Sequence, residues 1–149
     1  MPEQQIVPDS SDVAIREASD SDLERVIALW KACELTRPWN DPHKDAIAAL
    51  SGENSTILVG ESREQIIATV MAGGDGHRGW LYYLAVDPAH QRRGHGRAMV
   101  IAAEEWLAGI GIEKVQLMVR AGNEHAMDFY GALGYADQNV AVLGRWLAT

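Results

Sequence analysis

The stretch DPAHQRRGHGRAM, residues 87–99, gathers basic residues and glycines in a pattern typical of anion binding. Three arginines and two glycines fall within residues 92–97 of a chain that is otherwise acidic. The apolar run WLYYLAV (80–86) precedes them and predicts a strand, and a helical apolar spacing follows them. A glycine turn between a strand and a helix exposes backbone N–H groups where the helix dipole favours a negative charge. We therefore predict a pyrophosphate site here, with a plain basic turn at the solvent edge as the alternative.

Two familiar phosphate-binding loops do not fit this stretch. A Walker A loop requires G-x-x-x-x-G-K followed by serine or threonine, and the sequence contains no such run. The dinucleotide fingerprint requires glycine or alanine at its last position, where GHGRAM has Met99. A small residue at that position lets the helix pack closely on the strand, so methionine is a poor substitute.

The elements that must position this loop alternate between strand and helix patterns. We predict strands over residues 13–18, 55–61, 65–74, 80–86 and 114–120, and two short strands around Ala136 and over 140–147. We predict helices from the capping box SDLE (21–24) to Cys33, from the cap Asp41 to Ser51, over 94–107, and from the cap Asn123 to Gly134. A meander of strands followed by a strand–helix–strand crossover gives a mixed sheet in an α+β fold.

Composition narrows the classes of function. The 149 residues suit one domain, and the net charge of −8 argues against nucleic-acid and anionic-membrane partners. The single cysteine, Cys33, excludes an internal disulfide and fits a reducing compartment; it lies on an apolar helix stripe, which favours a packing residue over a nucleophile. No run approaches the roughly 18 apolar residues of a membrane helix, and residues 1–11 have the polar character of a loose tail. We therefore expect a cytoplasmic protein.

The loop and a second stretch together resemble a known family. VDPAHQRRGHGRA is similar to the acetyl-CoA loop [QR]-x-x-G-x-[GA] of the GCN5-related N-acetyltransferases (GNAT), with Gln91, Gly94 and Gly96 in register. NEHAMDFYGALGY (123–135) is similar to the family's N-x-x-A-x-x-x-Y-x-x-x-G-[FY] signature. The resemblance covers almost all of residues 13–149. RPWNDP and DGHRG are similar to a bacterial YpeA-type subgroup of the family.

The resemblance implies the GNAT fold and a single domain. That fold has a mixed central sheet of about seven strands flanked by about four helices. The domain would span residues 12–149, after the tail 1–11.

The resemblance also implies acetyl-CoA as a cosubstrate. Backbone groups of Leu84, Ala85 and Val86 would contact the thioester and the pantetheine arm, with the Leu84 N–H polarising the acetyl carbonyl. The residues implied to hold the pyrophosphate are Gln91, Arg92, Arg93, Gly94, His95, Gly96, Arg97 and Ala98. Asn123 would reach the cofactor arm while it caps its helix. We expect no metal, because His90, His95 and His125 lack the spacing and the cysteine partners of a zinc site.

Tyr130 occupies the position at which the family places its general acid, next to the cofactor. A phenol, with a pKa of about 10, can protonate the CoA thiolate as it leaves. Tyr130 also lies on an apolar stripe with Phe129 and Leu133, so a core tyrosine is the alternative.

The general base is the point at which the chain departs from the family pattern. N-terminal acetyltransferase relatives commonly carry a glutamate twelve residues before the tyrosine, where this chain has Met118, which cannot accept a proton. Asp75 and His77 of DGHRG are candidates for the base, with Asp41 as a third, because histidine titrates near neutral pH and a carboxylate can act through water. A polar hairpin loop is an equal alternative for DGHRG.

The connection between the first two helices is a candidate for the acceptor pocket. Trp39, Asn40 and Asp41 would line this pocket together with His77. Trp39 lies between two prolines and could equally pack as a lid on the core.

The predicted activity is transfer of an acetyl group from acetyl-CoA to a primary amine, by direct attack in a ternary complex. The acceptor is an amine on a small molecule or on a protein. The alternative is a regulatory module that binds acetyl-CoA or CoA without turnover, which Met118 favours. A phosphate-binding protein of another kind would leave the 123–135 signature unexplained. Exposed strand edges near the end of the chain are compatible with a homodimer.

Overall fold

The computed structural model describes residues 12–147, which form two compact units, 12–117 and 118–147. The first unit holds a sheet, three α-helices and two short 3-10 turns, and the second holds one α-helix. The single domain expected over residues 12–149 stays a prediction.

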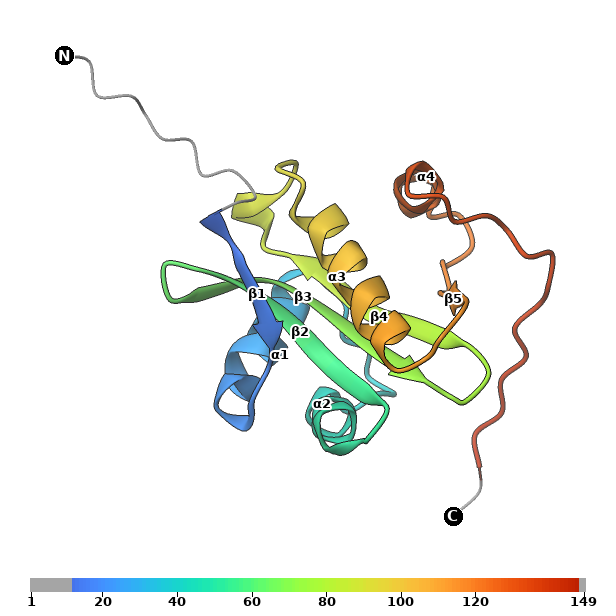
Figure 1. Cartoon of the computed structure of the whole chain (residues 1–149), viewed down its shortest axis with the longest axis horizontal. Helices are drawn as coiled ribbons and strands as arrows, with labels where there is room; N and C mark the ends of the chain where they lie inside the picture. The colour runs from blue at the N-terminus through green and yellow to red at the C-terminus, as the bar shows by residue number, and fades with distance from the viewer. Residues whose placement is uncertain (1–11, 148–149) are drawn as a thin grey trace. The chain divides into compact units, whose positions relative to one another are not determined.

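The first unit is built on a five-stranded mixed sheet, drawn as arrows in Figure 1. The strands are β1 (Ala14–Glu17), β2 (Ser55–Ser62), β3 (Gln65–Gly74), β4 (Gly79–Val86) and β5 (Val115–Gln116), in that spatial order. Neighbours from β1 to β4 are antiparallel, whereas β5 is parallel to β4. The predicted α+β class with a mixed sheet and four helices is therefore confirmed.

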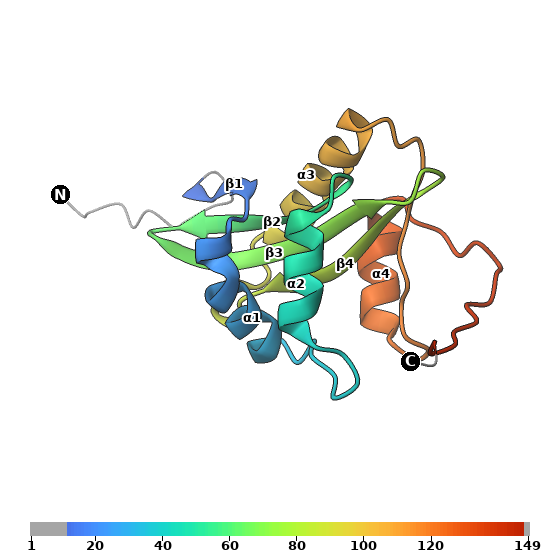
Figure 2. The same ribbon diagram turned by 90° about the horizontal axis from the view of Figure 1, so that it is seen from below.

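Helices cover both faces of this sheet, as Figure 2 shows. α1 (Leu23–Ala32) and α2 (Pro42–Ser51) lie on one face, and α3 (His95–Gly109) packs on the other. The core of the first face is a cluster of Val26, Ile27, Leu29, Trp30, Ala46, Ala49, Ile57, Val59, Ile66 and Ala85. Both faces of β2 and β3 are therefore buried, which explains why their sequences read as nearly unbroken apolar runs.

Close contact between α3 and the sheet depends on glycine. A Cβ placed on Gly60 of β2 would lie 3.3 Å from the Met99 sulfur, and one on Gly79 of β4 would lie 2.9 Å from the Leu107 side chain. The helix can therefore carry a methionine in its first turns because the sheet, rather than the helix, provides the small residues.

A buried carboxylate fixes the start of α1. Asp22, 1% exposed, accepts a hydrogen bond from the Ser19 N–H (2.8 Å) and pairs with Arg16 (2.7 Å) and Arg25 (2.6 Å). The capping interaction thus spans residues 19–22, within a 3-10 turn at Asp20–Asp22, so the prediction of a capping box over 21–24 was wrong by two residues. Its ion pairs with the two guanidinium groups compensate for the burial of the Asp22 carboxylate, which also accepts the hydrogen bond from Ser19. They also lower the Asp22 pKa well below its usual range.

α2 begins as predicted. The Asp41 side chain accepts hydrogen bonds from the backbone N–H groups of His43 (3.0 Å) and Lys44 (3.3 Å), and Pro42 is the first helical residue.

The second unit contains α4 (Glu124–Ala132), and both of its ends follow the sequence signals. The Asn123 side chain accepts from the Ala126 N–H (3.1 Å). Gly134, with φ of +94°, ends the helix. The Tyr135 N–H bonds to the Tyr130 carbonyl and the Gly134 N–H to the Gly131 carbonyl, both at 3.0 Å, which is a Schellman motif.

Three strand predictions were wrong. The strand predicted over 114–120 is two residues long, and the described residues 118–147 form no strand around Ala136 or over 140–147. The described chain therefore has five strands where the resemblance implied about seven. Alternation of apolar residues identifies side chains that could share a face, but it supplies no partner strand, and an unpaired strand is not stable.

Candidate functional site

The candidate cofactor residues of the first unit follow one another from β4 through a loop into α3. β4 pairs with β5 only at Gly79 and Trp80. From Leu81 to Val86, the edge of β4 that faces away from β3 therefore has no strand partner among the described residues. Leu84, Ala85 and Val86, which are predicted to contact the thioester and the pantetheine arm, lie on this open edge.

A β-bulge interrupts β4 at the predicted carbonyl-binding residue. Thr69 pairs with Ala85 and Met71 pairs with Tyr82, so two residues, Tyr83 and Leu84, lie opposite the single Val70. Tyr83 has φ of +52°, which costs a non-glycine residue about 1–3 kcal/mol. A bulge takes backbone groups out of the ladder and redirects them, and bulges are frequent beside active sites. The bulge carries no sequence signal, because no glycine marks the positive φ.

The loop after β4 is anchored at its base. The Gln91 amide donates a hydrogen bond to the Val86 carbonyl (3.0 Å), which also accepts from the Cys33 thiol (3.3 Å). The Gln91 side chain and the Val86 carbonyl thus hold the loop on β4. Burial raises the pKa of the Cys33 thiol, which is therefore a neutral packing group.

The tip of the loop presents unpaired donors. Arg92 (φ +65°) and Gly94 (φ +83°) are both left-handed. Within the described chain, none of the backbone N–H groups of residues 92–97 has a hydrogen-bond acceptor; the first bond of the helix runs from Ala98 to the Gly94 carbonyl. The guanidinium groups of Arg92, Arg93 and Arg97 are exposed and form no ion pair with any described carboxylate. Free N–H groups at the start of a 15-residue helix, beside three unpaired cations, have the geometry and the charge that can bind an anion.

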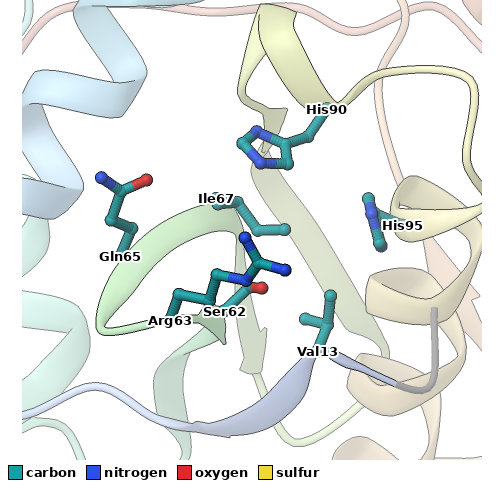
Figure 3. A pocket seen from close by; sticks show the side chains of 7 residues that line it. All are labelled: Val13, Ser62, Arg63, Gln65, Ile67, His90 and His95. Atoms are coloured by element: carbon teal, nitrogen blue, oxygen red, sulfur yellow. The ribbon is translucent and has the colours of Figure 1, made fainter. Parts of the chain in front are cut away.

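The His95 side chain is buried, so only its backbone N–H is available to a ligand of the loop. Its side chain is 3% exposed and points away from solvent into a pocket of about 290 Å³ (Figure 3). The pocket lies between the start of α3 and the β2–β3 hairpin; its lining residues are Val13, Ser62, Arg63, Gln65, Ile67, His90 and His95. Burial, together with the nearby His90 and Arg93, lowers the pKa of His95, so its imidazole is neutral near neutral pH. No cluster of metal-ligating side chains occurs among residues 12–147.

The two base candidates of the DGHRG turn differ in their environments. Asp75 accepts hydrogen bonds from the N–H groups of Arg78 (2.7 Å) and His77 (2.9 Å) and from the Trp80 indole (3.1 Å). These bonds lower the Asp75 pKa to about 2. Such a carboxylate is a weak base near neutral pH. His77 is exposed, and its Nδ1 lies 3.5 Å from Nη1 of Arg78.

The candidate acceptor residues lie in the connection between α1 and α2. Trp39 is 58% exposed, so it is not a lid on the core. Asn40 is also exposed, and the Asp41 carboxylate is committed to capping α2.

Tyr130, Asn123 and Met118 belong to the second unit. The Tyr130 ring makes edge contacts with Phe129 (5.0 Å between centroids) and Tyr135 (5.8 Å). Burial raises the pKa of its phenol, which therefore stays protonated at neutral pH. Met118 is 49% exposed and has no proton-accepting group.

Comparison with known proteins identifies relatives that match most of the chain in sequence or in fold. The profile of the Acetyltransferase (GNAT) family matches residues 23–135. An acetyltransferase of Yersinia enterocolitica is 41% identical over 133 residues, which cover 89% of this chain and 94% of the relative. The solved structure of AAC(6')-Iy with the bisubstrate analogue CoA-S-monomethyl-acetylneamine has the same fold, with a TM-score of 0.79 and 16% identity over 91% of this chain and 99% of that one.

A second solved structure has higher sequence identity. The ribosomal-protein-S18-alanine N-acetyltransferase of Escherichia coli is 26% identical, with a TM-score of 0.70 over 82% of this chain and 76% of that one. No helix within residues 12–147 combines the length and the apolar character needed to cross a membrane.

Proposed function

Because the chain belongs to the GNAT family of acetyl-CoA-dependent N-acetyltransferases, we propose that it acetylates a primary amine by direct attack within a ternary complex. The observation that carries the proposal is that the edge of β4 without a strand partner, which includes the bulge, leads directly into the unpaired N–H groups of residues 92–97. A thioester and a pyrophosphate are the two groups that such a surface can bind together.

The loop fits the pyrophosphate of acetyl-CoA. The N–H groups of residues 92–97 donate to its oxygens, and the helix dipole adds a favourable field. Arg92, Arg93 and Arg97 add positive charge that no described carboxylate neutralises. Asn123, at the start of α4, is assigned to the cofactor arm on its place in the family signature.

The Leu84 N–H polarises the acetyl carbonyl. Acetyl-CoA supplies the activated acyl group. Negative charge develops on the carbonyl oxygen when the amine adds, and a fixed N–H donor stabilises that charge. One such donor is worth about 3 kcal/mol of transition-state stabilisation.

Tyr130 donates the proton that the CoA sulfur takes up. Burial raises its pKa, so the phenol is protonated and can donate at neutral pH. The phenol is half-buried, and no described group competes for its proton.

His77 is the better of the two base candidates. Asp75 is held at a pKa of about 2 by its three hydrogen bonds and accepts a proton poorly. His77 is exposed next to it and can take a proton from the amine directly or through water.

The acceptor is a primary amine on a small molecule or a protein, recognised beside Trp39 and Asn40. We assign the chain to the YpeA-type subgroup through RPWNDP and DGHRG, and place it in the cytoplasm; a homodimer would use an exposed strand edge. The second candidate function, a CoA-binding regulator without turnover, is favoured by Met118, which stands where relatives carry a base.

Isothermal titration with acetyl-CoA, followed by a thiol-release assay over a panel of amines, tests the proposal. We expect micromolar binding and amine-dependent release of CoA. Binding without release from any small amine or peptide would support the regulator. Absence of binding would contradict both functions.

A further inference from the structure

The peptide group between Tyr83 and Leu84 is fixed from one side by a buried hydrogen-bond chain. The Thr69 hydroxyl donates to the Tyr83 carbonyl (3.1 Å) and accepts from the Trp30 indole N–H (3.0 Å). Trp30 and Thr69 are both 0% exposed, so no water competes for either bond. The hydroxyl has one proton, and the indole can only donate, so both bonds have a single direction.

The direction of this carbonyl determines the direction of the neighbouring N–H. The Tyr83 carbonyl and the Leu84 N–H belong to the same planar, trans peptide, in which they point in opposite directions. Because the carbonyl is bonded to Thr69 of β3, the Leu84 N–H points away from β3. That is the side on which β4 has no strand partner beyond Trp80.

The side chain of Tyr83 is fixed at both ends. Its ring stacks on the Trp30 indole, with centroids 3.8 Å apart and planes 11° apart. Its hydroxyl donates to the Asp45 carboxylate of α2 (2.8 Å). A left-handed tyrosine in a strand relaxes unless its surroundings hold it. Here α1, α2 and β3 each supply one of the contacts that hold it.

We propose that Thr69, Trp30 and Asp45 are positioning residues for acetyl transfer, because they fix the Tyr83–Leu84 peptide with its N–H toward the acetyl carbonyl. This inference rests on the proposed function in one respect, namely that the Leu84 N–H binds the thioester. The three residues touch neither acetyl-CoA nor the amine. Their effect passes through one peptide group, and hydrogen bonding to its carbonyl also strengthens its N–H as a donor.

Thr69→Val is the principal test. Valine keeps the shape of the side chain and removes the hydroxyl, and Thr69→Ser restores the hydroxyl. We expect Thr69→Val to lower kcat by about 10- to 100-fold and to leave the affinity for CoA, which has no acetyl group, within about threefold of wild type. Thr69→Ser should recover most of kcat.

The thioester carbonyl stretch of bound, carbonyl-labelled acetyl-CoA gives a readout that a loss of stability would not move. In the wild-type protein we expect a shift to lower frequency relative to acetyl-CoA in water-free solvent, because the Leu84 N–H polarises the bond. Thr69→Val should reduce the shift and Thr69→Ser should restore it. An unchanged kcat and an unchanged frequency in folded Thr69→Val would overturn the proposal.

Asp45→Ala tests the same peptide from the other end and keeps the proposal falsifiable if Thr69→Val does not fold. Alanine is a good helix former at this half-buried position of α2. We expect a several-fold loss of kcat with the same change in carbonyl frequency, whereas the neighbouring Lys44→Ala should change neither. If Asp45→Ala matches Lys44→Ala, the proposal fails. A wild-type protein that binds no acetyl-CoA would instead contradict the proposed function itself.

Discussion

Tyr130 is held at the last turn of α4 by its backbone and by its neighbours. The Tyr130 carbonyl accepts a hydrogen bond from the Tyr135 N–H at the end of the helix. The Tyr135 ring also packs against the Tyr130 ring. The helix end thus fixes the Tyr130 Cα and ring together, and only the hydroxyl is left without a described partner. This is the arrangement expected of a proton donor, since hydroxyl groups of buried core tyrosines are normally hydrogen-bonded.

Tyr130→Phe should lower kcat by about 10²- to 10⁴-fold with little change in acetyl-CoA affinity, because the ring packing survives and only the proton donor is lost. Steady-state thiol release and titration calorimetry provide the two values. Tyr135→Phe is the matched control, since it removes a hydroxyl from the ring on the other side of the same contact. Equal losses in the two variants would assign Tyr130 to packing.

The buried carboxylate of Asp22 contributes to the free energy of unfolding in a pH-dependent way. Hydrogen bonds from Arg16 come first among the causes that lower its pKa, and burial opposes them. A carboxyl group whose pKa is lowered in the folded state stabilises the fold at every pH above its unfolded value, about 3.9. That contribution disappears as the pH falls below this value toward the folded pKa.

Asp22→Asn should therefore reduce the free energy of unfolding by about 2–3 kcal/mol at pH 7, and by progressively less below pH 4. Urea unfolding at pH 7, 5 and 3 measures the difference. Asp20→Asn, in the same turn, is the control. A deficit that stays constant down to pH 3 would show that the charge of Asp22 is not what stabilises the fold.

At the scale of elements, the β2–β3 hairpin carries conformational strain in an exposed turn. Ser62 pairs with Gln65, and the two residues between them, Arg63 and Glu64, have φ of +50° and +66°. A two-residue loop with positive φ at both positions is a type I′ turn, which favours Asn-Gly. The Arg25 side chain bonds to the Glu64 carbonyl (3.1 Å) and helps to hold the turn.

Glu64→Gly should raise the free energy of unfolding by about 1 kcal/mol, because glycine adopts this φ freely and the bond from Arg25 goes to the backbone. Thermal unfolding followed by circular dichroism is sufficient. Glu64→Ala removes the same side chain without freeing φ. If alanine stabilises as much as glycine, the side chain and not the backbone was the source of the strain.

Elements with strong local signals could be predicted from the sequence. The apolar runs of β2 and β3, the Asp41 and Asn123 caps and the glycine end of α4 all lie where their residue types favour them. The β4 bulge could not be predicted, because tyrosine does not signal a positive φ and the contacts that hold it come from three other elements. The same limit applies to residues 118–120 and 140–147, where alternation is present but pairing depends on tertiary contacts.

The candidate site likewise contains some residues that motifs identify and others whose roles depend on tertiary contacts. The anion loop follows from its glycines and arginines, whereas the roles of Asp75 and Gln91 follow from hydrogen bonds that no motif specifies. The sequence of a short polar turn is the same whether its aspartate is free or accepts three hydrogen bonds, as Asp75 does.

At the scale of the whole molecule, a chain of net charge −8 keeps a locally basic loop at the start of α3. Repulsion among the three unpaired arginines makes a bound anion favourable at this loop, even though the net negative charge of the chain opposes the approach of an anion. Ligand binding to the folded state alone must then raise its stability.

Acetyl-CoA at about 100 times its dissociation constant should stabilise the protein by about 2.7 kcal/mol, which raises Tm by several degrees. Differential scanning fluorimetry with acetyl-CoA, CoA and ATP measures the shift and its salt dependence. In the double variant Arg92→Gln/Arg93→Gln, the rise in Tm caused by acetyl-CoA should be at most half of the wild-type value. An equal shift with ATP would indicate a general phosphate site rather than one shaped for CoA.

The connectivity of the sheet also has a consequence for the order of folding. β2, β3 and β4 are joined by short turns, whereas β1 pairs with β2 across α1 and α2, and β5 joins β4 at residues 36 positions apart. Because closing a longer loop costs more entropy, the meander should assemble first and its two outer strands last. Contacts that form last and bury little are also the first to open, so amide exchange should be fastest at β5. Release of this two-residue strand would thus extend the free edge of β4 to Gly79 and Trp80, while the peptide held by Tyr83 inside the meander stays in place.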